Sequence, residues 1–167
     1  PLFLAADQLS RAVDERLAFP AAAARLLASG RGGRAARSGC YRYDSRGHRR
    51  GPDPTVRAVL EVALRPIPPR AVVDRCALRI MAATIASLDA AVLGAGAASV
   101  GAVLAVGFPP GRGGPLRHAD ALGARVLLSR YDELTRALGS RFEAPRLLRE
   151  LARSDAAAGA LATWRGG

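Results

Sequence analysis

One segment of this 167-residue chain restricts the backbone more than any other. It runs from Gly107 to Asp120 and reads GFPPGRGGPLRHAD. The paired prolines fix φ at two successive residues, and the adjacent glycines admit backbone angles that a β-carbon forbids. Paired prolines and glycines of this kind predict a rigid, sharply turning loop between helical stretches.

The remaining chain has the apolar spacing of helices. The sequence predicts helices over residues 5–15, 20–29, 54–64, 71–92, 99–106, 123–138 and 145–154. The longest helix would bury Leu78, Ile85 and Leu88, with Val73 and Met81 beside them. Residues 30–53 are rich in glycine and serine, which predicts a loop, and no segment shows the alternation of a strand. The expected fold class is all-α.

An internal repeat supports a duplicated helical unit. When the chain is shifted by 125 positions, residues 7–26 align with residues 132–151 without a gap, with seven identities in twenty. Asp7 and Pro20 recur as Asp132 and Pro145. Self-similarity at a fixed offset indicates a repeated supersecondary module. We therefore expect two superposable helix pairs, with the first copy truncated because the chain opens at Pro1.

The Gly107–Asp120 segment closely resembles the GFPP-x-RGGP-x-R-x-AD phrase in the C-terminal domain of NAD-dependent 3-hydroxyacyl-CoA dehydrogenases. The resemblance is to the form that multifunctional fatty-acid β-oxidation enzymes fuse to an enoyl-CoA hydratase. Three other segments resemble the family in the same order: the glycine-rich element at 30–44, the helix start at 73–75, and the RFEAPRLL segment at 141–148. Together they cover roughly residues 7–154. The resemblance implies a duplicated helical domain of the 6-phosphogluconate dehydrogenase C-terminal-like type.

This resemblance also implies that different domains bind the cofactor and close the substrate cleft. In the family, NAD binds a separate Rossmann domain, a His–Glu pair there handles the hydroxyl proton, and the C-terminal domain closes the acyl-CoA cleft and supplies a dimer-like helical contact. The resemblance thus implies no catalytic residue, cofactor or metal in this chain alone. Its implied partners are a NAD-binding domain in cis or in trans, an acyl-CoA substrate and a second copy of the chain. The implied cleft or domain-contact residues are Gly39, Tyr41, Gly107, Phe108, Pro109, Pro110, Arg112, Gly113, Gly114 and Pro115.

The chain departs from the family pattern in several places. It contains no asparagine, and Ala82 and Ala83 occupy the positions of a usual Asn-Glu pair. In the glycine-rich element, Ala35 and Ala36 replace the family's lysine and hydroxyl residue, and Arg37 replaces its middle glycine. Arg34 and Arg37 are candidates for phosphate contacts. The domain division that follows is a first repeat remnant at 1–53, a linker helix and proline-rich break at 54–69, a second repeat at 70–156 and a tail at 157–167.

Composition leaves two other function classes open. All 25 basic residues are arginine and the net charge is +11, which fits either biased codon usage or binding to a polyanion. The arginines between residues 31 and 57, interleaved with Tyr41 and Tyr43, favour the alternative of a basic helical nucleic-acid-binding protein. Residues 90–108 carry no charge, which favours a membrane-associated protein, although most of them are alanine or glycine. Cys40 and Cys76 lack metal-ligand spacing and no signal sequence opens the chain, so we expect free thiols and a cytoplasmic location.

Three smaller motifs favour structural roles. The Gly94–Ser99 segment has the spacing of a dinucleotide fingerprint but follows a predicted helix instead of a strand, so it predicts an interhelical turn. His118 has no predicted nucleophile nearby, which favours packing over general-base catalysis. Asp120 is expected to cap the next helix or to bond the loop backbone.

Overall fold

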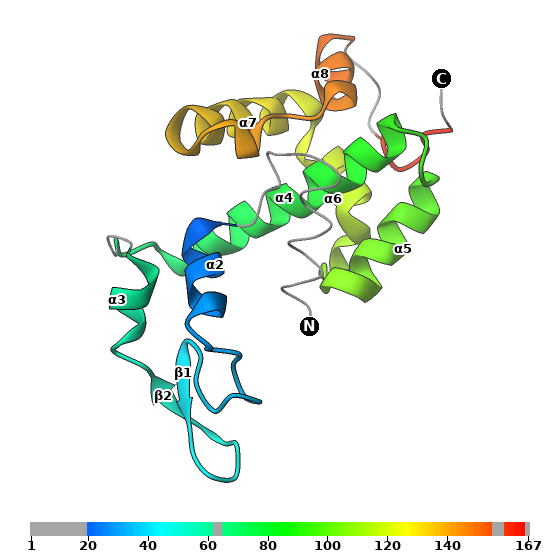
Figure 1. Ribbon diagram of the computed structural model, residues 1–167. Coiled ribbons are helices and arrows are strands. Elements are labelled where there is room, and N and C mark those ends of the chain that lie inside the picture. Colours follow the sequence, from blue (N-terminus) through cyan, green and yellow to red (C-terminus); the bar gives the residue numbers. More distant parts are fainter. Residues whose placement is uncertain (1–19, 62–64, 155–158, 166–167) are drawn as a thin grey trace. The chain divides into compact units, whose positions relative to one another are not determined.

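The computed structural model describes residues 20–61, 65–154 and 159–165, and divides into two units, Pro1–Pro66 and Ile67–Gly167 (Figure 1). The described part of the first unit contains helix α2 (Ala21–Ala28), strands β1 (Tyr41–Tyr43) and β2 (Arg49–Pro52), and helix α3 (Val56–Leu60). The second unit contains α4 (Pro69–Asp89), α5 (Ala95–Val106), the 3-10 turn η2 (Pro110–Arg112), α6 (Gly114–Leu122), α7 (Ala124–Leu138), the 3-10 turn η3 (Ser140–Phe142) and α8 (Arg146–Arg153). The helix predicted over 5–15 lies outside the described residues.

The mostly helical fold class is confirmed, with three corrections to the predicted elements. The interhelical turn predicted over Gly94–Ser99 is wrong from Ala95 onward, because α5 already begins at Ala95. The loop predicted over 30–53 contains a short antiparallel hairpin, in which Tyr41 faces Pro52 and Tyr43 faces Arg49. The turning segment from Gly107 to Asp120 is a loop only as far as Gly113, because α6 begins at Gly114. Pro115 is compatible with this start because the first turn of a helix needs no N–H from it.

Helix α4 is the central element of the second unit (Figure 1), and α5, α6 and α8 all pack against it. Its inward face carries Leu78, Met81, Ile85 and Leu88, each at most 5 % exposed. Val73, predicted to flank this face, is instead 65 % exposed. Apolar burial along this stripe is the main stabilising contribution to the unit.

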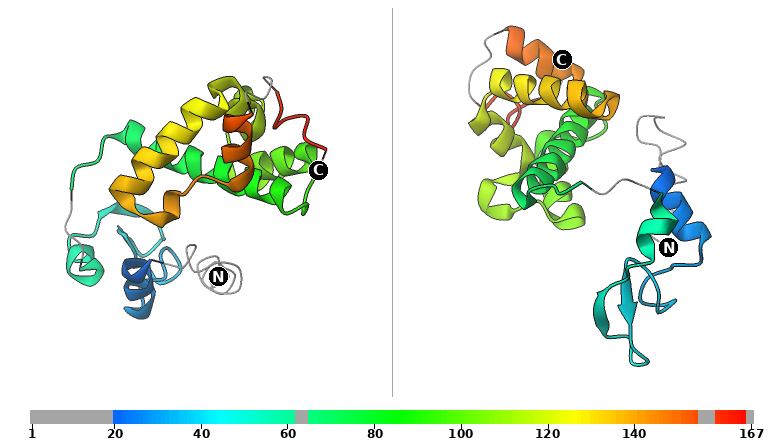
Figure 2. Two further views of the ribbon diagram at one scale, coloured as in Figure 1. Left: turned by 90° about the horizontal axis from the view of Figure 1, so that it is seen from above. Right: turned by 90° about the vertical axis from the view of Figure 1, so that its left-hand side faces the viewer.

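Helices α7 and α8 complete the core, lying side by side in both views of Figure 2. Leu127 and Tyr131 of α7 and Leu148 of α8 are fully buried. The Tyr131 hydroxyl donates a hydrogen bond to the Leu78 carbonyl in α4, so the one polar atom of this buried ring is satisfied. Burial raises the pKa of that hydroxyl well above its usual value.

The described half of the internal repeat has the same local structure in both copies. Helices α2 and α8 occupy equivalent repeat positions, each eight residues long and each preceded by a proline with extended backbone angles. Pro20 has φ −58° and ψ 133°, and Pro145 has φ −57° and ψ 149°. Residues 7–19, the other half of the first copy, lie outside the described part.

Asp120 ties the C-terminal segment to the core. Its carboxylate accepts hydrogen bonds from the backbone N–H groups of Leu161 (3.1 Å) and Ala162 (2.9 Å). The expected helix cap or loop contact is therefore replaced by a bond to the backbone of a distant segment. Leu161 is 1 % exposed and Trp164 packs against the core, so the predicted tail at 157–167 includes packed residues.

The charge-free stretch 90–108 does not form a membrane span. It includes α5, which is twelve residues long, and Gly107 ends that helix in a left-handed conformation. Within the described residues no helix combines the length and apolar character needed to cross a membrane.

We expect Asp120→Ala to release the C-terminal segment. Two backbone N–H groups would lose their acceptor, and each unsatisfied buried donor costs about 1–3 kcal/mol. Trp164 is the sole tryptophan, so its emission reports on this segment alone. A red shift of its emission in Asp120→Ala, with helical circular dichroism retained, is the predicted result. Unchanged emission would show that Leu161 packing suffices without the carboxylate.

Candidate functional site

The predicted cleft or domain-contact loop connects α5 to α6. Gly107 ends α5 in the left-handed region at φ 73°, and Pro109 and Pro110 then lead into the turn η2. Gly113 and Gly114 follow at φ 74° and 86°, as the adjacent glycines predicted. A β-carbon on Gly114 would stand 3.1 Å from the Ser99 β-carbon of α5. Glycine is therefore required here by both the backbone angle and the close approach of α5.

The predicted contact residues of this loop divide into a buried group and an exposed group. Phe108 is 2 % exposed and belongs to the core, and Gly114 and Pro115 are also buried, so these three belong mainly to the scaffold. The exposed group consists of Gly107, Pro109, Pro110, Arg112 and Gly113.

A shallow hollow of about 190 Å³ joins the exposed part of the loop to α5. Pro110, Gly113 and Gly114 line it from the loop. The facing residues of α5 are Ser99, Val100, Val103 and Leu104. Leu104 is 80 % exposed and Val100 57 % exposed, an unusual exposure for large apolar side chains on neighbouring turns of one helix. Sequence reasoning missed this α5 contribution; the charge-free stretch 90–108 was the signal that could have found it.

His118 packs beneath the loop, as predicted. Its ring lies 6.0 Å from the Phe108 ring, centre to centre, at a tilt of 53°. Burial lowers the pKa of His118, and the positive charges of Arg112 and Arg130 lower it further. The imidazole is therefore neutral near pH 7 and supports packing, with a cationic neighbourhood on its open side.

The predicted residues of the first unit occupy a separate module. Gly39 is buried, and a β-carbon there would stand 2.9 Å from the Gly33 α-carbon, so Gly39 is structural. Tyr41 is 38 % exposed and lies under the Arg49 guanidinium, whose carbon is 4.6 Å from the ring centre. The phosphate-contact candidates Arg34 and Arg37 are exposed. Gly39 and Tyr41 thus belong to the first unit, whereas the α5–α6 loop belongs to the second.

A polar network in the same unit was not predicted. The Arg31 guanidinium donates to the Asp53 carboxylate at 2.7 Å and to the Gly39 carbonyl at 3.1 Å, and also bonds the Thr55 hydroxyl. Both side chains of the Arg31–Asp53 pair are at most 15 % exposed. The hydrogen bond from Arg31, followed by those from Thr55, lowers the pKa of Asp53 to about 2. Arg31, one of the basic residues that favoured polyanion binding, is thus a structural residue.

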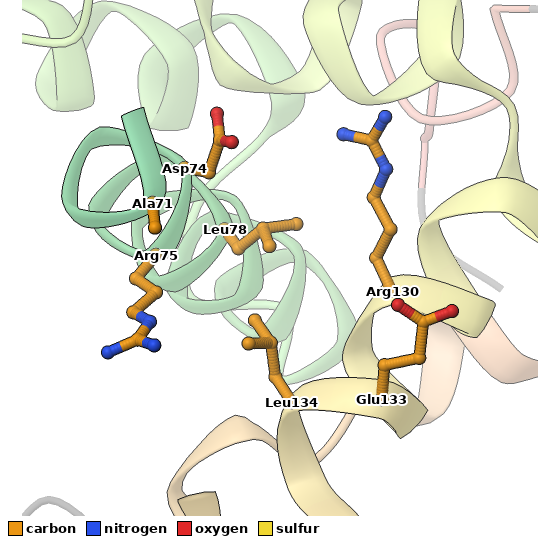
Figure 3. Close-up of a pocket in the computed structure, with 7 residues that line it drawn as sticks. All are labelled: Ala71, Asp74, Arg75, Leu78, Arg130, Glu133 and Leu134. Atoms are coloured by element: carbon orange, nitrogen blue, oxygen red, sulfur yellow. The ribbon is translucent and has the colours of Figure 1, made fainter. Parts of the chain in front are cut away.

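Two further pockets lie in the second unit, away from the predicted residues. One, of about 300 Å³, lies between α4 and α7, with Leu78 and Leu134 as its apolar floor and Asp74, Arg130 and Glu133 around it (Figure 3). The other, of about 440 Å³, is a mostly apolar groove between α4 and α5. In the described part of the chain no group of histidine, cysteine and carboxylate side chains could hold a metal ion.

Comparison with known proteins finds extensive similarity to one kind of enzyme subunit. The chain is 32 % identical over 152 residues to the fatty acid oxidation complex subunit alpha of Shewanella oneidensis, and 32 % identical over 150 residues to that of Shewanella loihica. These matches cover 89 % and 87 % of this chain, but 21 % of each relative. The chain thus spans about a fifth of the length of the curated relatives it matches. No protein-family model matches it. The resemblance to a C-terminal domain of multifunctional β-oxidation enzymes is confirmed by these homologues.

We expect Gly114→Val to destabilise the second unit by about 1–3 kcal/mol, because valine would adopt a left-handed backbone and collide with Ser99. Gly111→Val is the matched control, since no atom lies within 4 Å of a β-carbon at that exposed position. Arg112→Ala should change stability by no more than about 0.5 kcal/mol. Thermal melts of the three variants test these expectations. Equal melting temperatures of Gly114→Val and the parent would refute the requirement for glycine.

Acid should weaken the first unit through Asp53. Because its pKa is lowered on folding, its ionised form stabilises the fold above the ordinary value of 3.8, and that contribution is lost as the pH falls towards about 2. A carboxyl-detected NMR titration should give a midpoint near 2 for Asp53, and Asp53→Asn should remove this part of the acid sensitivity. A midpoint at the ordinary value would show that the Arg31 pair does not persist in solution.

Proposed function

We propose that this chain is the C-terminal domain of a NAD-dependent 3-hydroxyacyl-CoA dehydrogenase of fatty-acid β-oxidation. The observation that carries the proposal is the similarity of nearly the whole chain to one fifth of the fatty acid oxidation complex subunit alpha proteins. The order of the glycine-rich element, the Gly107–Asp120 segment and the closing RFEAPRLL segment supports the same assignment. In this proposal the chain closes an acyl-CoA cleft and contacts another domain.

The residues of the chain do not fit NAD. The Gly94–Ser99 segment precedes and opens α5, and the element before it is the helix α4. A dinucleotide fingerprint instead needs a strand leading directly into its glycine turn. We therefore assign NAD to a separate Rossmann domain, supplied in cis or in trans.

The surroundings of His118 likewise do not suit this residue to proton transfer. His118 is partly covered by Phe108, and the charges that act on it, Arg112 and Arg130, are both positive. A general base of this reaction class needs a group that stabilises its protonated form, usually a carboxylate. His118 has the opposite environment, so we assign it a packing role and assign the hydroxyl proton to the partner domain.

The contact surface that we assign consists of Val100 and Leu104 of α5 with Pro110 and Gly113 of the loop. We propose that the NAD-binding dehydrogenase domain covers this surface. Two apolar side chains exposed beside a shallow hollow suit a protruding apolar residue of a partner. The prolines and glycines make this surface rigid, which reduces the entropy lost on association.

The proposal is tested by replacing the matched segment of the Shewanella oneidensis relative with this chain. NADH formation from a 3-hydroxyacyl-CoA should exceed that of the same relative with the segment deleted, judged against the unaltered relative. The isolated chain should neither bind NAD in calorimetric titration nor form NADH. A folded chimera no more active than the deletion protein would refute the proposed role.

Leu104→Glu tests the assigned surface in the same chimera. It should lower NADH formation about tenfold or more, because a charge would be buried in an apolar contact. Val126→Glu is the matched control, since Val126 is also an exposed apolar residue, on α7. Equal losses of NADH formation in the two variants would show that the contact does not lie on α5.

A further inference from the structure

The hairpin module of the first unit carries a concentrated positive charge. Residues 30–53 contain seven arginines and two aspartates. Each aspartate is engaged by one arginine: Asp53 by Arg31 at 2.7 Å, and Asp44 by Arg50 at 2.9 Å. The other five, for which the described part of the chain provides no carboxylate partner, are Arg34, Arg37, Arg42, Arg46 and Arg49. All five are exposed.

Asp44, which pairs with Arg50, also holds the hairpin turn. Its carboxylate accepts hydrogen bonds from the backbone N–H groups of Arg46 and His48, both at 2.9 Å, and thereby shapes the hairpin turn. The His48 hydrogen bond is the main cause that lowers the pKa of Asp44. Because both acids serve to build the module, the charge left at its surface is strongly positive.

The fold brings the unpaired arginines from two segments together. A backbone bridge between Ser38 and Arg42 places the 33–38 segment beside β1, with Arg37 next to that bridge. The Arg34 side chain lies against the hairpin turn, with its Nε 3.3 Å from the place of a β-carbon on Gly47. Arg49 is stacked over Tyr41, which orders its guanidinium. These contacts define a basic surface of Arg34, Arg37 and Arg49 beside the partly exposed Tyr41 ring.

We propose that this surface binds the phosphate groups of a nucleotide. Guanidinium groups match phosphate oxygens with paired N–H donors, and ordered arginine and tyrosine planes can also stack on a base. The phosphates could come from a coenzyme A ester or from a single-stranded nucleic acid, which share this chemistry. The inference uses only the first unit and does not depend on the proposed dehydrogenase role.

The test uses the full chain and three probes. A fluorescein-labelled twelve-residue oligothymidylate is read by anisotropy, with coenzyme A and dephospho-coenzyme A as competitors. Calorimetry then measures the direct binding of coenzyme A and of dephospho-coenzyme A. We expect saturable binding of the oligonucleotide or of coenzyme A. Binding of coenzyme A but not of dephospho-coenzyme A assigns the site to the 3′-phosphate. Binding of the oligonucleotide without competition by coenzyme A assigns it to a nucleic acid.

A double variant, Arg34→Ala with Arg49→Ala, should weaken binding about tenfold or more and reduce the slope of log affinity against log salt by about two. The matched control is Arg117→Ala with Arg136→Ala, which removes the same charge from exposed positions in the second unit. Circular dichroism checks the fold of both. Failure of every probe to bind, or equal weakening in the two double variants, would overturn the proposal.

Discussion

The close approach of α5 and α6 at Gly114 is the constraint on which the second unit depends. A β-carbon at the start of α6 would crowd Ser99, and its residue would have to adopt a left-handed backbone, so glycine is strongly favoured at Gly114. From that start, Leu116 and Ala119 become fully buried. Because α6 also packs against α4 and α7, a wider spacing at Gly114 would disturb the whole core. The same backbone path leaves Pro110 and Gly113 at the surface beside α5.

The long helices could be predicted from the sequence, because apolar spacing sustained over three or more turns fits a helix and does not fit a strand. Helices α4 and α7 accordingly lie within a few residues of their predicted ranges. Helix α6 was hidden because its first residues, glycine and proline, are usually loop residues. The hairpin was hidden because its strands have three and four residues, and its turn depends on hydrogen bonds to Asp44 that no periodicity reveals.

The candidate site was predicted at the level of the segment but not of the side chain. Motif resemblance marks Phe108 and Arg112 equally, although one is buried in the core and the other lies at the surface. Only the packing of α6 separates them, and it adds Val100 and Leu104, which no motif marked. In the same way, the charge pattern of the sequence does not distinguish Arg31 from Arg46. The structure pairs Arg31 with Asp53 and leaves Arg46 open to a ligand. Burial and pairing thus decide which residues can act.

We place the contact with a dehydrogenase domain on α5 and the loop that follows it. Hydrogen–deuterium exchange, compared between the isolated chain and the chimera with the Shewanella oneidensis relative, tests this placement most directly. Slower exchange in the chimera, concentrated at residues 99–114, is the predicted result. Unchanged exchange there, or protection confined to the pocket between α4 and α7, would contradict the assignment.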